Sequence, residues 1–385
     1  MSTKIPTKTV SGWGVISKLR ELLDLSGYRS ATILVGKSSL AMSGQLRSIE
    51  LDLQGLVVHV VSGVGPMPTL ESIEQLVRQE KAHPLPHVVI GIGGGSVLDS
   101  AKCLAILLVQ RNSLRDILAK RDLILPKAVP CVAVPTTAGT GSEVTSQATI
   151  WDLNGKKKYS LKNECMYPEY AILDPALTLS LPPRITAITG LDALTHALEA
   201  AYSIHSTPET DIHALQAINA IMTELENVVV DGSNRRAREV LLQGSLHAGL
   251  AIARTSTAAA HAVSYPLTIH YGIPHGYAVG LLVPEFLMYN SGVNETDCQD
   301  PRGVAFVLDR CKLIATELRC SDIVEARNKL RQLIAKIGLK TSLRELGVTD
   351  LELISRESTD PDRVSNQPRL VTEQNVRSLL REIYQ

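Results

Sequence analysis

The amino-acid sequence predicts an α/β amino-terminal domain with a parallel sheet, followed by an all-α carboxyl-terminal domain. The chain has 385 residues, more than a single hydrophobic core usually supports, so two domains are expected. From Ala31 to Leu173, short β-branched runs alternate with helical stretches, which is typical of a parallel sheet with helices on both faces. Strand signals disappear after Leu181-Pro182-Pro183. We therefore expect one domain at residues 1–180 and a second at residues 181–385.

The individual elements follow from the spacing of apolar residues. In the first domain, apolar β-branched runs predict strands at Ala31–Gly36, Leu56–Ser62, His87–Ile92 and Ala128–Pro135. In the second domain, apolar residues at helical spacing predict helices at residues 186–204, 211–227, 233–252 and 325–337. The polar stretch at residues 294–302 is interpreted as a surface loop and little else.

Two glycine-rich segments each follow a predicted strand directly. Ser96 and Asp99 have the spacing of a capping box, which predicts a helix to about Val109. Glycines before a helix amino terminus let the backbone approach a phosphate. One such segment alone is more often a tight turn, but two of them indicate the cofactor site of a Rossmann-like, dinucleotide-binding domain. The candidate cofactor-binding residues are Gly93, Gly94, Gly95, Ser96 and Asp99 in the first segment, and Thr136, Thr137, Thr140 and Ser142 in the second.

The second predicted domain contains four candidate metal ligands, Asp192, His196, His261 and His275. Asp192 and His196 lie four residues apart, so both reach the same side of a helix. Three imidazoles and one carboxylate suit Fe(II) or Zn(II) better than Mg(II) or Ca(II). Each residue also has a structural interpretation. Asp192 can cap a helix, and His261 lies among alanines, where a lone histidine is more often part of the core.

The bulk composition argues against several classes of protein. Lys plus Arg and Asp plus Glu both number 39, a zero net charge that attracts neither nucleic acid nor an anionic membrane surface. No apolar run approaches the roughly 20 residues needed to span a bilayer, and the amino terminus has no hydrophobic signal-peptide segment. The six cysteines are scattered without a CxxC motif, so we expect reduced thiols in a cytoplasmic protein.

These motifs together resemble the iron-containing (group III) alcohol dehydrogenase family. The resemblance rests on segments 93–102, 135–143, 192–196 and 261–276, which occur in the family's order, and it covers nearly the whole chain. It implies the family's dehydroquinate-synthase-like fold, a homodimer, and Fe(II) or Zn(II) held by the four candidate ligands. It also implies the reaction, in which NAD(P)H on the first domain passes a hydride to a carbonyl that the metal polarises.

Two positions depart from the family pattern. Many members have a second histidine four residues after position 261, where this chain has Tyr265. Tyr265 can donate a proton and His270 can supply an imidazole, so both are candidate catalytic residues; the alternative is that both only pack the helix. Members that prefer NAD commonly have an acidic residue after the first strand, whereas this chain has Lys37 and Ser38. A cation and a hydroxyl there favour NADP(H) over NAD(H), unless Lys37 is only a solvated loop residue.

The substrate is predicted from a basic residue near the candidate metal ligands. Arg254 lies seven residues before His261, with Thr257 between them, so all three share one face if residues 248–263 form a single helix. A cation facing the metal indicates an anionic substrate. The run that follows Arg254 resembles the phosphonoacetaldehyde reductase branch, which implies that phosphonoacetaldehyde is reduced to 2-hydroxyethylphosphonate. The alternatives are a generic short- or medium-chain alcohol dehydrogenase, a sulfonated-aldehyde reductase, or an Arg254 that pairs with a structural carboxylate such as Glu199.

Two other classes of protein are considered. The same fold hosts dehydroquinate-synthase-like cyclases, whose metal ligands are a glutamate and two histidines. Asp192 with three histidines argues against that class. A non-catalytic nucleotide-binding protein would have no reason to hold four metal ligands. We therefore expect a metal-dependent, NAD(P)-linked oxidoreductase that interconverts an alcohol and an aldehyde.

Overall fold

The computed structural model describes residues 5–37, 44–360 and 364–385. The chain divides into two compact units. Unit 1 comprises residues 1–137 and 141–181, and unit 2 comprises residues 138–140 and 182–385. The predicted boundary at residue 180 places segment 138–140 in the first domain, whereas in the structure this segment belongs to unit 2.

Unit 1 is built on a parallel sheet, which confirms the predicted fold class. Six strands in the described residues are ordered β1-β8-β5-β4-β2-β3, and every neighbouring pair is parallel. The central strands β2, β4 and β5 are buried on both faces because helices cover both sides of the sheet. The strands are β1 (Lys8–Ser11), β2 (Ser30–Gly36), β3 (Val57–Val64), β4 (Val88–Gly93), β5 (Cys131–Pro135) and β8 (Tyr170–Leu173).

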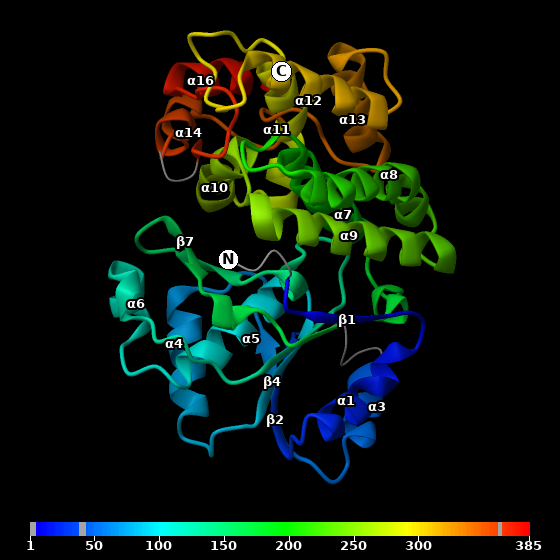
Figure 1. Cartoon of the computed structure of the whole chain (residues 1–385), viewed down its shortest axis with the longest axis vertical. Coiled ribbons are helices and arrows are strands. Elements are labelled where there is room, and N and C mark those ends of the chain that lie inside the picture. Colours follow the sequence, from blue (N-terminus) through cyan, green and yellow to red (C-terminus); the bar gives the residue numbers. More distant parts are fainter. Residues whose placement is uncertain (1–4, 38–43, 361–363) are drawn as a thin grey trace. The chain divides into compact units, whose positions relative to one another are not determined.

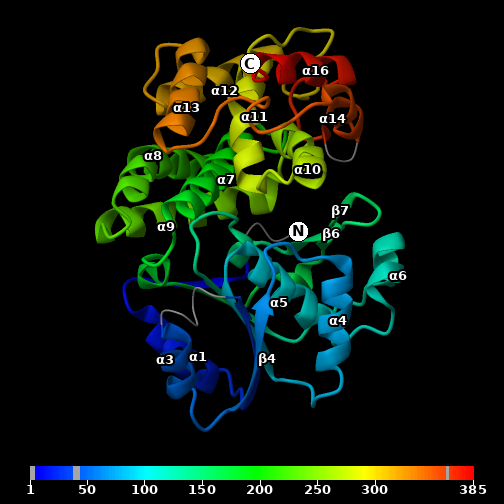
Figure 2. The same ribbon diagram turned by 180° about the vertical axis from the view of Figure 1, so that it is seen from behind.

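The helices of unit 1 pack on opposite faces of this sheet. They are α1 (Leu19–Leu25), α3 (Gln45–Asp52), α4 (Leu70–Glu80), α5 (Gly95–Leu107) and α6 (Leu114–Ala119). Ile33 and Val35 of β2 pack in one core with α1 and α3, whereas Leu34 packs in another with α4 and α5. This alternation follows from the two-residue period of a strand. Figures 1 and 2 show the two helix pairs on either side of the strands.

The sequence pattern does not predict the antiparallel hairpin of β6 (Gln147–Asp152) and β7 (Lys157–Lys162). The N–H of Gly155 donates to Asp152 Oδ1 at 2.7 Å, which stabilises the turn between the two strands. The strand signal of β7 is weak because three of its six residues are lysines. Short 3₁₀ helices lie at Val15–Lys18, Arg121–Leu123, Ser142–Val144, Glu164–Met166 and Pro175–Thr178.

Unit 2 contains only helices and loops in its described residues, as the sequence predicts. The helices are α7 (Pro183–Tyr202), α8 (Pro208–Val230), α9 (Arg235–Thr255), α10 (Ala259–Tyr271), α11 (His275–Asn290), α12 (Val304–Glu317), α13 (Ile323–Lys336), α14 (Leu351–Glu357) and α16 (Glu373–Glu382). The four helices predicted from apolar spacing correspond to α7, α8, α9 and α13 to within a few residues at each end. Helix α7 is buried along most of its length and packs against α8, α9 and α11.

The structure contradicts a single helix over residues 248–263. Helices α9 and α10 are separated by a break at Ser256, whose φ is 57°. A positive φ cannot continue a right-handed helix. The Glu199 carboxylate accepts hydrogen bonds from the backbone N–H groups of Ala258 and His261. Because these N–H groups lie at the start of α10, Glu199 satisfies donors that the helix itself leaves unpaired.

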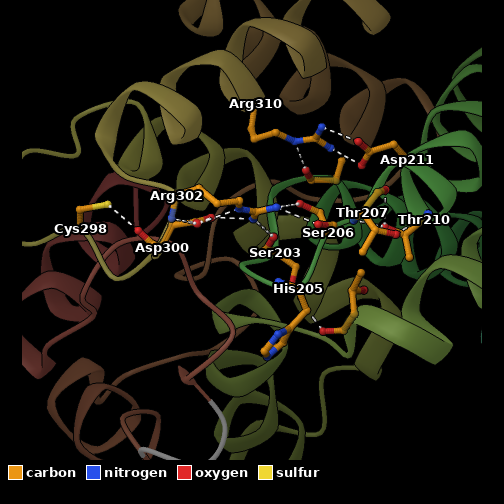
Figure 3. A network of polar contacts seen from close by, with 12 residues as sticks. Ser203, His205, Ser206, Thr207, Thr210, Asp211, Cys298, Asp300, Arg302 and Arg310 are labelled. Atoms are coloured by element: carbon orange, nitrogen blue, oxygen red, sulfur yellow. Dashed lines mark hydrogen bonds and ion pairs between the residues drawn. The ribbon is translucent and has the colours of Figure 1, made fainter. Parts of the chain in front are cut away.

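The stretch at residues 294–302 is a loop, as predicted, but it also joins a buried polar network. Arg302 forms an ion pair with Asp300 at 2.7 Å. Its guanidinium also donates to the carbonyl oxygens of Ser203 and Ser206, at 3.0 and 2.7 Å. Figure 3 shows these contacts around the connection between α7 and α8. The loop therefore fixes the end of α7, which the expectation of a simple surface loop missed.

Two predictions from the overall composition concern membrane-spanning segments and the state of the cysteines. No helix in the described part of the chain is long and apolar enough to cross a membrane. The six cysteines all lie within the described residues, and all are free thiols in the structure.

Candidate active site

The two glycine-rich loops begin at the carboxyl ends of neighbouring parallel strands. Strands β4 and β5 are neighbours with Gly93 opposite Pro135, so the loops that follow them begin side by side. The chain also changes direction between β2 and β4, because β3 lies on one side of β2 and β4 lies on the other. Ligands of open α/β sheets bind outside the carboxyl ends of the strands at such a reversal. The geometry therefore supports a nucleotide site at the ends of β2 and β4.

Close packing explains the glycines in the first loop. A Cβ atom on Gly93 would lie 2.5 Å from Val97 Cγ2, and one on Gly94 would lie 3.3 Å from Thr137 Cγ2. Thr136 donates its backbone N–H to the carbonyl oxygen of Gly93 at 2.9 Å. Helix α5 begins directly after these glycines, so its first N–H groups lie beside the loop, where an anion would be stabilised.

Ser96 and Asp99 do not form the predicted capping box. Gly94 is the residue before the helix, with φ −74° and ψ −179°, so Ser96 already lies in the first turn and donates to a backbone carbonyl at 2.5 Å. Asp99 instead accepts hydrogen bonds from the Ser142 hydroxyl at 2.6 Å and from the Thr149 N–H at 2.8 Å. The side chain of Asp99 therefore holds the second loop and β6 against α5.

The second loop contributes to both units. Thr136, Thr137 and Ser142 belong to unit 1, whereas Thr140 belongs to the short segment of unit 2. Within that segment, Gly139 packs tightly against α7, because a Cβ atom there would lie 2.8 Å from the Cβ of Thr189. The cofactor-binding roles of these residues stay predictions.

Lys37 lies at the end of β2, beside the strand that leads into the first loop. Strands β2 and β4 are paired with Val35 opposite Ile92, and Lys37 is exposed. Ser38, the other residue predicted to favour NADP(H), lies outside the described residues. The position of Lys37 is compatible with a contact to the adenosine end of a dinucleotide, and its role stays a prediction.

In unit 2, three of the four candidate metal ligands converge. Asp192, His261 and His275 each place one ligand atom within 4.8 Å of the others. Asp192 Oδ1 and His261 Nε2 are 3.8 Å apart, and neither atom has a hydrogen-bond partner among the described residues although both are buried. Buried polar atoms are normally paired, so a cation bound by both atoms would satisfy them. The donor set fits Fe(II) or Zn(II).

His196 lies beside these three residues. Its Nε2 atom is 4.0 Å from Asp192 Oδ1, and its ring stacks on that of His261 with centroids 4.7 Å apart. Burial lowers the pKa of His196 to about 4, so this imidazole is neutral, the form that a metal ligand requires. The structure thus groups three of the predicted ligands and places the fourth next to them.

The charged groups of this cluster shift one another's pKa values. Burial raises the pKa of Asp192, but the imidazoles of His196, His261 and His275 outweigh it and hold that pKa well below its usual range. Burial lowers the pKa of His261, but the carboxylates of Glu199 and Asp192 outweigh it and raise that pKa to about 10. Asp192 is therefore ionised beside a protonated His261, and a metal ion bound at Nε2 would replace that proton.

Glu199 has a role in this group that the sequence did not assign. Its carboxylate is fully buried, and Oε2 lies 2.6 Å from His261 Nδ1. A carboxylate on Nδ1 leaves Nε2 as the ring nitrogen available to a metal. Glu199 follows Asp192 by seven residues on α7, which is two helical turns and the same side of the helix. That spacing is the signal that could have identified it.

The two candidate catalytic residues lie in different surroundings. Tyr265 is buried, and its ring stacks on that of His275 with centroids 5.6 Å apart. His270 lies near the end of α10, where its Nε2 is 2.8 Å from Glu357 Oε2 of α14. The structure therefore brings Tyr265 to the candidate metal ligands, whereas the recorded contact of His270 is with another helix.

Arg254 and Thr257 do not share a helix with His261. Arg254 is exposed in the last turn of α9, and Thr257 lies in the break that follows. The break removes the single helical face on which the sequence placed both residues. The alternative carboxylate partner, Glu199, accepts hydrogen bonds from Ala258 and His261. The substrate-binding roles of Arg254 and Thr257 stay predictions.

Because the second loop contains a buried carboxyl group, we predict that the stability of the protein depends on pH. Burial raises the pKa of Glu143 from 4.5 to about 7, and its Oε1 has no partner among the described residues. Since the folded pKa exceeds the unfolded one, the stability contributed by the protonated form is lost as the pH rises from about 4.5 through 7. Glu143→Gln should remove that slope and be more stable than the parent above pH 7, by on the order of 1–3 kcal/mol. Urea unfolding across this pH range measures it, and parallel pH profiles for both proteins would contradict it.

Comparisons with known proteins identify the family. Two glycine-rich loops on a parallel sheet and a carboxylate–imidazole group on helices are compatible with an oxidoreductase acting on CH–OH groups, and the match to a family decides the class. The iron-containing alcohol dehydrogenase model matches residues 6–175, and the model for the carboxyl-terminal part of the Fe-containing alcohol dehydrogenase family matches residues 186–384. The chain belongs to the iron-containing alcohol dehydrogenase family. This confirms the predicted enzyme class.

Individual relatives differ in substrate. The chain is 36% identical to phosphonoacetaldehyde reductase of Streptomyces viridochromogenes, over 86% of this chain and 84% of that protein. It is 31% identical to long-chain-alcohol dehydrogenase 1 of Geobacillus thermodenitrificans, over 96% and 93%. The structure of sulfoacetaldehyde reductase from Bifidobacterium kashiwanohense in complex with NAD+ superposes with a TM-score of 0.86 at 28% identity, covering 99% of this chain and 98% of that one.

Proposed function

We propose that this protein is a metal-dependent, NAD(P)H-linked reductase of a short aldehyde with an anionic tail, such as phosphonoacetaldehyde. The proposed reaction rests on the cluster of Asp192, His261 and His275 in a chain of this family. A cation would satisfy the buried atoms Asp192 Oδ1 and His261 Nε2, which have no hydrogen-bond partner among the described residues. The proposal of this substrate rests on the similarity of the chain to phosphonoacetaldehyde reductase. The implied homodimer and cytoplasmic location stay predictions.

The residues of the chain divide the chemistry between them. Asp192, His261 and His275, with His196 beside them, would hold Fe(II) or Zn(II), which supplies Lewis-acid polarisation of a carbonyl. The glycine-rich loops would hold the dinucleotide that donates the hydride to the carbonyl carbon. The oxygen must gain a proton as the alcohol forms, and the Tyr265 hydroxyl would deliver it. Loss of NAD(P)H oxidation after chelation, and recovery on adding metal back, tests the reaction.

We propose that Arg254 binds the anionic tail of the substrate. Phosphonate and sulfonate oxygens pair with a guanidinium in bidentate geometry, which a neutral aldehyde cannot do. A long-chain alcohol, suggested by the other relative, would instead require an apolar pocket. A panel of short aldehydes with a phosphonate tail, a sulfonate tail or no charge separates these candidates.

Arg254→Ala should raise the Michaelis constant for phosphonoacetaldehyde by at least about tenfold, the effect of losing one charge-assisted contact. The same change should leave the constant for propionaldehyde unchanged. Arg236→Ala, at an exposed position in the first turn of the same helix, is the matched control. A uniform loss across charged and neutral aldehydes would contradict the assignment of Arg254 and leave the reductase reaction standing.

We also propose that the cofactor is NADP(H) in preference to NAD(H), through Lys37. Lys37→Asp should weaken NADPH binding by about 1–3 kcal/mol and NADH binding much less, because only NADPH carries the 2′-phosphate. Fluorescence titration of both cofactors measures the difference, with Lys120→Asp at an exposed position after α6 as the control. Equal losses for both cofactors would show that Lys37 is only a solvated residue.

A further inference from the structure

Unit 1 contains a second cluster of metal-ligand side chains, which the reductase reaction does not use. His59, Glu80 and His83 each place one ligand atom within 4.8 Å of the other two. His59 Nδ1 lies 3.0 Å from Glu80 Oε2, and the rings of His59 and His83 are 4.5 Å apart at their centroids. All three residues belong to unit 1, whereas the Asp192 group belongs to unit 2.

Two elements of unit 1 bring these side chains together. Glu80 is the last residue of α4, and His83 follows in the turn, where its N–H donates to the carbonyl oxygen of Glu80 at 3.1 Å. Residues three positions apart lie on the same side of a helical turn. His59 belongs to β3, which is the edge strand of the sheet. The cluster therefore joins the end of a helix to the edge of the sheet.

The buried carboxylate of Glu80 favours the binding of a cation at this cluster. Glu80 is only 4% exposed, and His59 provides the only ion pair recorded for it among the described residues. The Thr32 hydroxyl donates to the same Oε2 atom at 3.3 Å. Burying a carboxylate is costly unless its charge is compensated. The carboxyl end of α4 adds the negative end of a helix dipole, which also favours a cation.

We propose that His59, Glu80 and His83 form a second metal site, which binds Zn(II) or another divalent cation that prefers nitrogen and oxygen ligands. Two imidazoles and one carboxylate make a three-ligand Zn(II) set that leaves a position for water. Both histidines are exposed, so an ion reaches the site from solvent, while the buried Glu80 provides the charge. Binding ties α4 to the edge strand β3 and stabilises unit 1.

Zinc titration of the full-length protein tests this proposal. After removal of metal with a chelator, the parent protein should bind two Zn(II) ions per chain by isothermal titration calorimetry. The double variant His59→Ala/His83→Ala should keep one ion and lose the other, with the affinity of the lost site falling at least about tenfold. His275→Ala should show the reverse, keeping the site in unit 1. His87→Ala, which removes an exposed histidine from the same unit, is the matched control and should bind two ions.

Thermal unfolding provides a second measurement that does not depend on activity. Zn(II) should raise the unfolding midpoint of His275→Ala, and adding His59→Ala/His83→Ala to that background should abolish the rise. Equal zinc stoichiometry and affinity with and without the two histidines would overturn the proposal. A lower midpoint in metal-free double variant combined with unchanged zinc binding would also overturn it, because the three residues would then be a structural contact only.

Discussion

His261→Ala is expected to remove the metal and to lower turnover by at least about a thousandfold, while nucleotide binding persists. His261 Nε2 is a buried atom without a hydrogen-bond partner among the described residues, 3.8 Å from Asp192 Oδ1. Losing this ligand should prevent Lewis-acid polarisation, which is worth several kcal/mol, and each 1.4 kcal/mol is about tenfold in rate. Metal content per chain, turnover and NADPH fluorescence measure the three quantities separately.

Two further variants separate loss of metal from loss of fold. His261→Ala also leaves the buried Glu199 carboxylate without its imidazole partner, which is expected to be destabilising. His275→Ala leaves that pair in place and should still lose the metal. His270→Ala, on the same helix as His261 but in contact with Glu357, should keep it. Normal metal content and turnover in either ligand variant would contradict the assigned site.

The sheet and the longer helices were predictable because their signals are local. Strands such as β4 consist of β-branched and small apolar residues that are buried on both faces, and β4 ends at Gly93. The lysine-rich strand β7 is not predictable from its own residues, because three lysines in six positions give it no apolar alternation. Helix α5 begins earlier than the capping pattern predicts, because the residue before it is Gly94, which has no side chain to cap the helix, and not Ser96.

The convergence of the metal-ligand candidates was partly predictable. Asp192 and His196 follow from helical spacing on α7, but the sequence alone does not bring α10 and α11 to them. The break at Ser256 was not predictable from local residues, because its stabilising partner is Glu199 on α7. For this reason, Arg254 and His261 do not share the helical face that the sequence predicts. A contact between helices determined where α10 begins.

Glu199→Gln is expected to weaken metal binding by about 10–100-fold, the range measured for residues that orient a metal-bound histidine. The carboxylate accepts hydrogen bonds from the N–H of Ala258 at 2.7 Å and from His261 Nδ1 at 2.6 Å, both through Oε2. A glutamine keeps the shape but removes the negative charge, and its amide nitrogen cannot accept either hydrogen bond. The imidazole should then be a less basic and less well oriented ligand.

Competition with a chromophoric chelator measures the metal affinity of Glu199→Gln, and Glu209→Gln at an exposed position on α8 serves as the control. Turnover should recover substantially when metal is saturating, since Glu199 acts through His261 and does not contact the substrate in this assignment. A glutamate that only stabilised the break before α10 would behave differently. The unfolding midpoint would fall while the metal affinity of the folded protein stayed unchanged, and that result would restrict Glu199 to a structural role.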